Sequence, residues 1–282
     1  MRCAKSVALW CALAVGVLAA AGFAATYALQ NEFIFPNAAE GPMARPIPPG
    51  ATQYWLETAD GARVESWLFV PPGASPQNPA PAVIFFHGNS DYIETKLEYP
   101  QFYIEHGIAC LMVEYRGYRR STGTPSEAAL AADADGFYDW LASRPDIDRS
   151  RIAAHGHSLG ASVAAGLAAR RPLRALVMAS PFLSLPAMMG RYLAPGFLAN
   201  DRFDNAAALA RYEGPVLVLH GENDDIVPIA HARRLVEATE GRARLVVLSP
   251  DDHDIPWDWS TFAATLTQFY TETGVIAATS DH

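Results

Sequence analysis

Residues 151–170 read RIAAHGHSLGASVAAGLAAR and contain the strongest structural signal in this chain. RIAAH is an apolar run typical of a buried strand, and ASVAAGLAAR is typical of a helix. GHSLG between them places Ser158 on a strand-to-helix turn whose two glycines let neighbouring backbones approach closely. A GxSxG string alone also fits an ordinary glycine-rich turn, but its position between strand and helix favours an accessible, nucleophilic serine.

Other apolar runs predict the rest of a sheet. Continuous aliphatic runs are typical of parallel strands covered on both faces, and amphipathic segments alternate with them here. We therefore predict an α/β fold with a mostly parallel central sheet of about eight strands and helices on both faces. The strands are expected at 52–58 and 64–70, as an antiparallel pair, and at 81–87, 108–115, 151–155, 174–180, 215–220 and 243–249. The helices are expected near 92–106, 126–143, 159–170, 229–239 and 257–273.

Two later turns could activate the serine. A serine hydroxyl is a poor nucleophile, so a histidine must take its proton and a carboxylate must orient that histidine. In a parallel sheet such groups are expected on turns at the carboxyl ends of strands. The turn after residues 215–220 contains Asp224 and Asp225, either of which could be the carboxylate or could simply cap a helix. The turn after residues 243–249 contains His253, our candidate base.

The oxyanion formed in acyl transfer needs backbone N–H donors. For a serine on this kind of turn, one donor is the amide of the next residue, here Leu159, and the other lies in a loop after an early strand. That loop reads HGNS at 87–90, and we choose the amide of Asn89. Among the other histidines near these turns, His157 is expected to pack beside the serine, and His87 and His220 are expected to organise loops by hydrogen bonding.

The composition excludes several classes of protein. Hydrophobic residues make up 50% of the chain and charged residues 18%, which excludes a disordered chain. The formal net charge is −9, whereas nucleic-acid binding requires a positively charged surface. No nucleic-acid partner is therefore expected. The three cysteines have no CxxC spacing and no HExxH string occurs, so we predict neither a disulfide framework nor a metal site. Serine chemistry needs no cofactor.

The N-terminal segment resembles a membrane anchor. Arg2 and Lys5 precede the uncharged stretch 6–29. This stretch is longer than the roughly 20 residues that are needed to span a bilayer. A signal peptide has a shorter apolar region of about 7 to 15 residues, so a retained anchor is favoured, with secretion after cleavage as the alternative. The leading positive charges place the remainder on the extracytoplasmic side of the membrane. We predict an anchor or uncleaved signal at 1–30, a proline-rich linker at 31–50, the α/β domain at 51–274 and a tail at 275–282.

Taken together, residues from about 30 to 270 resemble the α/β-hydrolase superfamily. The motifs occur in the order found in a branch of small hydrolases that includes serine aminopeptidase-like proteins and membrane-anchored protein depalmitoylases. The resemblance implies that Ser158, Asp224 and His253 form a catalytic triad, with the amides of Asn89 and Leu159 as oxyanion donors. The motifs are HGNSD (87–91), EYRGYRRSTGTPSE (114–127), GHSLG (156–160), ASPFLSL (179–185), HGENDDIVP (220–228) and DDHD (251–254).

The chain departs from this family pattern at a few positions. Ser90 and Asp91 replace two small residues after HGN, and Asp252 replaces a glycine before the base histidine. Residues 118–120, Tyr-Arg-Arg, replace smaller residues after YRG. These departures leave the implied mechanism intact but do not support transfer of a relative's substrate to this chain.

The segment 183–214 is too short for a large lid, which predicts an open pocket. Its apolar residues could line an acyl groove or cover the sheet; they are Leu183, Leu185, Met188, Met189, Tyr192, Leu193, Phe197 and Leu198. Our leading hypothesis is a serine hydrolase that cleaves carboxylic esters or thioesters through an acyl-enzyme on Ser158. One alternative is an aminopeptidase-like enzyme, in which Asp91 could hold the substrate ammonium group. The other is an inactive hydrolase-fold binding or scaffold protein.

Overall fold

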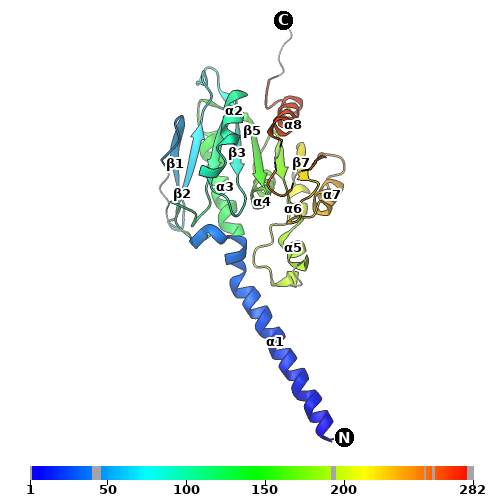
Figure 1. Ribbon diagram of the computed structural model, residues 1–282. Helices are drawn as coiled ribbons and strands as arrows, with labels where there is room; N and C mark the ends of the chain where they lie inside the picture. Colours follow the sequence, from blue (N-terminus) through cyan, green and yellow to red (C-terminus); the bar gives the residue numbers. More distant parts are fainter. Residues whose placement is uncertain (1, 40–45, 192–194, 251, 256–257, 278–282) are drawn as a thin grey trace.

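One eight-stranded sheet forms the centre of the molecule (Figure 1). The computed structural model describes the chain except for residues 1, 40–45, 192–194, 251, 256–257 and 278–282. The strand order is β1-β2-β4-β3-β5-β6-β7-β8, with β2 antiparallel to both β1 and β4 and all other neighbours parallel. This architecture confirms the predicted fold class. The strands are β1 (Ala51–Glu57), β2 (Arg63–Phe69), β3 (Ala80–Phe86), β4 (Ala109–Val113), β5 (Ile147–His157), β6 (Leu176–Ala179), β7 (Val216–Gly221) and β8 (Ala243–Leu248).

Helices cover both faces of the sheet, as its buried strands require. Successive side chains of a strand point to opposite faces, so Ile84 and Phe86 of β3 join one apolar cluster and Val83 and Phe85 join the other. The first cluster is completed by α3 (Glu127–Ala142), α4 (Leu159–Ala168), α6 (Asn205–Leu209) and α7 (Ala230–Glu237). The second is completed by α2 (Glu98–Glu105), which follows η2 (Ile93–Thr95), and by α8 (Trp259–Glu272).

The segment between β6 and β7 contains short helices that the sequence analysis left unassigned. They are α5 (Leu185–Arg191), the 3₁₀ helix η3 (Gly196–Leu198) and α6. Pro186, Pro195 and Gly196 interrupt the helical pattern, so no single long helix can form there. The described part of this segment forms no large lid, in agreement with the prediction.

The N-terminal helix α1 (Arg2–Ile34) extends away from the domain (Figure 1). Its residues Leu13–Ile34 are long and apolar enough to cross a membrane, which fits either an anchor or a signal sequence. The helix does not end at residue 31, where the predicted linker begins. It continues to Ile34 and is followed by η1 (Pro36–Ala39), and the ring of Phe35 is buried in the core of the domain. The first part of the predicted linker 31–50 therefore packs against the domain.

Candidate active site

Ser158 lies on a sharp turn between the last residue of β5 and the first residue of α4. Its backbone has φ 52° and ψ −114°, a strained conformation for a residue with a side chain. Two glycines make the turn possible. A Cβ on Gly156 would lie 2.1 Å from the carbonyl oxygen of Gly160, and a Cβ on Gly160 would lie 2.1 Å from that of Phe86. This close approach also brings the loop after β3 beside the serine.

Ser158, His253 and Asp224 are joined by hydrogen bonds although they are far apart in the sequence. The distance is 3.0 Å between Ser158 Oγ and His253 Nε2, and 2.8 Å between His253 Nδ1 and Asp224 Oδ2. Because the carboxylate accepts, Nδ1–H donates to it, which leaves Nε2 to accept the serine proton. All three residues are at most 9% exposed. The arrangement can therefore move a proton from the serine to the imidazole in a nearly dry environment.

Asp224 rather than Asp225 faces the imidazole. Oδ1 of Asp224 accepts from the amides of Ile226 and Val227, and Oδ2 lies 3.3 Å from His220 Nε2 as well as against His253. Burial acts to raise the pKa of Asp224, but the hydrogen bonds from His220, His253 and Val227 outweigh it and hold this pKa well below its usual range. The group is thus a carboxylate at neutral pH. Asp225 is exposed.

Two further side chains hold the backbone of His253, and sequence reasoning gave neither this role. His157 Nε2 and Ser180 Oγ both donate to the carbonyl oxygen of His253, at 2.9 and 3.0 Å. Ser180 follows β6 and has a positive φ of 47°, which resembles the strain at Ser158. His157 had been expected only to pack beside the serine. These bonds fix the turn that carries the imidazole.

Leu159 and Asn89 are the two residues predicted to supply the oxyanion donors. Both line the same cavity as Ser158. Leu159 is the first residue of α4, so its amide has no partner within the helix. The loop that carries Asn89 is held by Tyr118, whose hydroxyl donates to the Asn89 carbonyl oxygen at 2.7 Å. The Asn89 side chain in turn donates to the carbonyl oxygen of Ile34, the last residue of α1, at 3.3 Å.

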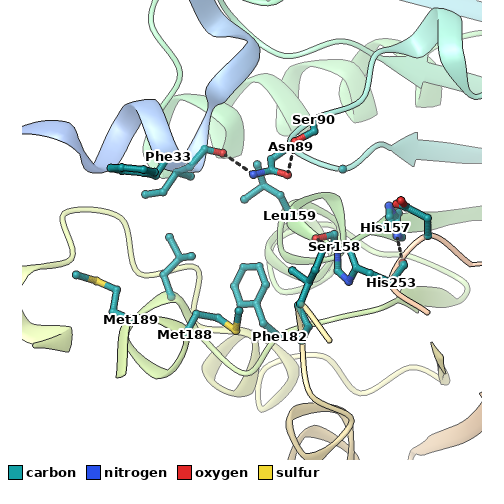
Figure 2. Close-up of a pocket in the computed structure, with 16 residues that line it drawn as sticks. Phe33, Asn89, Ser90, His157, Ser158, Leu159, Phe182, Met188, Met189 and His253 are labelled. Carbon is teal, nitrogen blue, oxygen red and sulfur yellow. Dashed lines mark hydrogen bonds between the residues drawn. The ribbon is translucent and has the colours of Figure 1, made fainter. Parts of the chain in front are cut away.

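The cavity in front of Ser158 has a volume of about 420 Å³ and is mainly apolar (Figure 2). Leu185, Met188 and Met189 of the predicted groove line one side, whereas Phe197 is 78% exposed outside it. Tyr192 and Leu193 lie outside the described residues. The opposite side is formed by Phe33 and Ile34 of α1. Sequence reasoning missed this wall, because nothing local in the leader indicates where its end packs.

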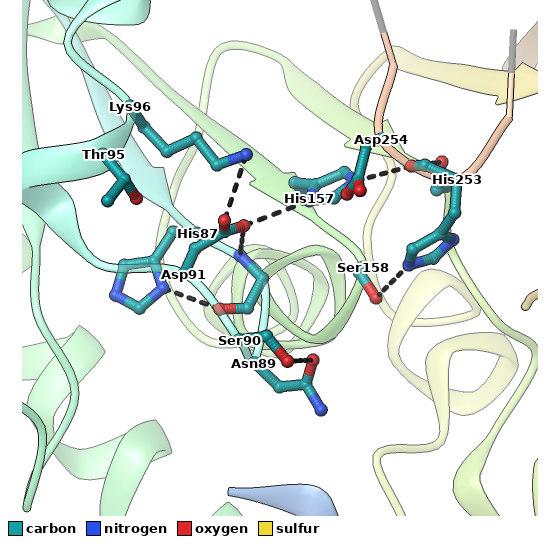
Figure 3. A network of polar contacts seen from close by, with 12 residues as sticks. His87, Asn89, Ser90, Asp91, Thr95, Lys96, His157, Ser158, His253 and Asp254 are labelled. Carbon is teal, nitrogen blue, oxygen red and sulfur yellow. Dashed lines mark hydrogen bonds and ion pairs between the residues drawn. The ribbon is translucent and has the colours of Figure 1, made fainter. Parts of the chain in front are cut away.

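Asp91 occupies a polar network beside the site (Figure 3). It accepts from the amide of Gly88 at 3.2 Å and pairs with Lys96 at 3.1 Å. Burial would raise the pKa of Asp91, but His157 and Lys96 more than compensate and lower it. Asp91 is not among the residues that line the cavity, so its carboxylate supports the Gly88 turn. Within the described residues, no group of three or more His, Cys, Asp and Glu side chains is arranged to hold a metal ion.

Two family models match this chain, and known proteins are similar to most of its length. A family model described as serine aminopeptidase, S33, matches residues 77–203, and one described as serine hydrolase (FSH1) matches residues 150–263. Protein Rv2307c of Mycobacterium tuberculosis is 38% identical over 248 residues, which cover 86% of this chain and 87% of that protein. The α/β hydrolase domain-containing protein WAV2 of Arabidopsis thaliana is 30% identical over 253 residues, covering 80% of this chain and 81% of that protein.

Solved structures show the same fold at low identity. An esterase of Pyrococcus furiosus matches with a TM-score of 0.69 and 18% identity, over 83% of this chain and 96% of that chain. Esterase 2 of Thermogutta terrifontis matches with a TM-score of 0.68 and 19% identity, over 83% of this chain and 98% of that chain. Together with the relative WAV2, which is 30% identical over 80% of this chain, these matches confirm the family resemblance predicted from the motifs, and the chain belongs to the α/β-hydrolase superfamily.

Proposed function

We propose that this protein is a serine hydrolase that cleaves carboxylic esters or thioesters through an acyl-enzyme on Ser158. The observation that supports it most is the hydrogen-bonded series from Ser158 through His253 to Asp224. Three side chains from three separate turns meet with the geometry that proton transfer requires, and they open into an apolar cavity. The strained backbone at Ser158 is further support, because such strain concentrates at functional sites.

The proposed reaction has two halves. His253 Nε2 takes the proton of Ser158 Oγ as this oxygen attacks the carbonyl carbon, and the resulting oxyanion accepts hydrogen bonds from the amides of Leu159 and Asn89. The intermediate collapses, and the departing alkoxide or thiolate takes the proton from His253. A water then attacks the acyl-enzyme with His253 as its base, and this step releases the carboxylic acid and restores Ser158. Asp224 stabilises the imidazolium in both halves.

We place the catalytic domain at the extracytoplasmic surface of a membrane, held by α1. The basis is the length of the apolar helix and the position of Arg2 and Lys5 before it. Secretion after cleavage is the alternative arrangement. The division of the chain into an anchor (1–30), a linker (31–50) whose first part packs against the domain, a hydrolase domain (51–274) and a tail (275–282) belongs to this proposal.

An aminopeptidase-like activity is the second candidate, because one matching family model carries that description. Such an enzyme needs a carboxylate at the pocket to hold the substrate ammonium group. Asp91 pairs with Lys96 instead, and the acidic side chain among the described lining residues is the exposed Asp254. The apolar lining favours acyl substrates. Comparing aminoacyl arylamides with acyl esters on the same preparation separates the two activities.

Turnover of p-nitrophenyl butyrate by purified variants tests the proposed function. Ser158→Ala should lower kcat by about 10⁶-fold, and Asp224→Asn by about 10⁴-fold because the imidazole loses its orienting carboxylate. Asp225→Asn is the matched control, one residue away on the exposed side of the same turn, and should stay near wild type. Retained hydrolysis in Ser158→Ala, or equal losses in the two aspartate variants, would count against the assignment.

A further inference from the structure

A second cavity, along α1, adjoins the cavity at Ser158. The second cavity has a volume of about 550 Å³ and shares Phe33, Ile34, Leu185 and Met189 with the first. It extends to Thr26 and Gln30 on α1 and to Ala199 beyond η3. The two cavities are therefore adjacent, and we call them together the α1 groove. In Figure 2 its walls face each other, with Phe33 on one side and Met188 and Met189 on the other.

The end of α1 is fixed to the domain, so this wall of the groove has a defined position. Gln30 donates to the carbonyl oxygen of Leu198 at 3.3 Å and accepts from the amide of Asn200 at 2.8 Å. Phe35 packs edge-on against Phe203, with ring centroids 6.4 Å apart. The bond from Asn89 to Ile34 joins the helix end to the loop that carries the proposed oxyanion donor. α1 is therefore positioned against both the groove and the reaction centre.

The outer end of the groove lies within the apolar part of α1. Thr26 belongs to the uncharged stretch 6–29. Its hydroxyl donates to the carbonyl oxygen of Gly22 at 3.0 Å, so this donor is already paired within the helix and the side chain adds little polarity to the groove. Phe33, which lines the groove, and Phe197 of η3 are 76% and 78% exposed. Large apolar side chains exposed next to a membrane-spanning stretch are expected to lie in the bilayer interface.

We propose that residues 26–34 of α1 form one wall of the substrate site, and that the α1 groove takes a long acyl chain whose far end remains in the membrane. This inference rests on the proposed function. The reacting carbonyl lies at Ser158, the chain runs between α1 and α5, and its tail leaves the groove at Thr26 and Ala199. The helix that anchors the protein thereby also sets the preference for acyl-chain length.

The test uses the full-length protein in phosphatidylcholine vesicles, with p-nitrophenyl butyrate and p-nitrophenyl palmitate as probes. Ala199→Trp fills the outer end of the groove and leaves the space at Ser158 open. It should lower kcat/KM for the palmitate by at least about 100-fold, since each methylene lost from an apolar site costs about fourfold. It should leave kcat/KM for the butyrate within about twofold of the wild-type value, because the substitution does not touch the catalytic groups. Ala264→Trp, the same change on the exposed face of α8, is the matched control.

A second variant, Thr26→Trp, fills the groove from the α1 side and should give the same chain-length-selective loss. If both filled variants hydrolyse palmitate as the wild type does, or if both lose the two substrates equally, the inference is overturned. These outcomes differ from failure of the proposed function, in which butyrate hydrolysis is absent in the wild type or survives in Ser158→Ala.

Discussion

His253 shows how the site is built at the scale of single residues. Its ring contacts Ser158 on one side and Asp224 on the other, while its carbonyl oxygen accepts from His157 and Ser180. A histidine on a surface turn would otherwise sample several rotamers. Bonds at both the ring and the backbone hold it in one orientation, so little reorganisation is needed when a proton moves.

His155 makes stability depend on pH. It is fully buried near Phe85, Tyr99 and Phe262, and its Nδ1 lies 2.6 Å from the hydroxyl of Tyr103. Burial, with a smaller contribution from His157, lowers the pKa of His155 to about 3. The unfolded chain takes up this proton near pH 6.5 and the folded chain does not, so the contribution of His155 to stability is complete above that pH and falls towards pH 3.

Chemical denaturation of the full-length protein in detergent measures this effect. Between pH 7 and pH 5 the wild type should lose about 2 kcal/mol of unfolding free energy through His155. His155→Leu, which removes the imidazole and serves as the control for all other titrating groups, should lack that part of the loss. Parallel pH profiles for the two proteins would show that His155 does not titrate as described.

At the scale of elements, the turn at Ser158 depends on two close backbone approaches. Gly160→Ala would force a Cβ against the carbonyl oxygen of Phe86 and should destabilise the fold by at least about 3 kcal/mol. Gly166→Ala is the matched control on the same helix. Its added Cβ meets only the flexible end of Arg170, at 3.2 Å, and should stabilise the helix by up to about 1 kcal/mol. Denaturation midpoints compare the two, and equal stabilities would contradict the close approach.

Elements whose structure is determined locally could be predicted from the sequence. β3, β4, β6 and β7 are buried along their whole length, and their continuous aliphatic runs indicated this. Ser158, Asp224 and His253 could be predicted to act together because each follows an apolar run at the carboxyl edge of the sheet. The helix predicted at 92–106 is shorter, since only Glu98–Glu105 is α-helical after the 3₁₀ turn η2.

Features that depend on tertiary packing could not be predicted. To predict the contact of Phe33 and Ile34 with the site, one must know where α1 ends on the domain. The apolar character of these two residues is equally consistent with a longer membrane-spanning leader. The bonds from His157 and Ser180 to the carbonyl of His253 join three separate turns. The short helix α5 was missed because Pro186 and Gly190 break its pattern. The helix α6 was missed because its five residues are too few to show a helical period, and both helices pack against the core.

At the scale of the whole molecule, the apolar helix and the reaction centre lie on the same side of the domain. α1 and α5 project from one end of the sheet (Figure 1). The turns after β3, β5, β7 and β8 all contribute to the site, so the carboxyl edge of the sheet is the edge that faces α1. In the proposed function, this arrangement places membrane attachment and acyl transfer on one surface.

Covalent labelling with a fluorophosphonate tests the central claim most directly, because the reagent requires an activated serine. Wild-type protein should gain one adduct, which peptide mass spectrometry should locate on Ser158. Ser158→Ala should remain unlabelled, and His253→Ala should label at least about 10³-fold more slowly because the base is missing. A folded wild-type protein that stays unlabelled, or an adduct on any residue other than Ser158, would contradict the account.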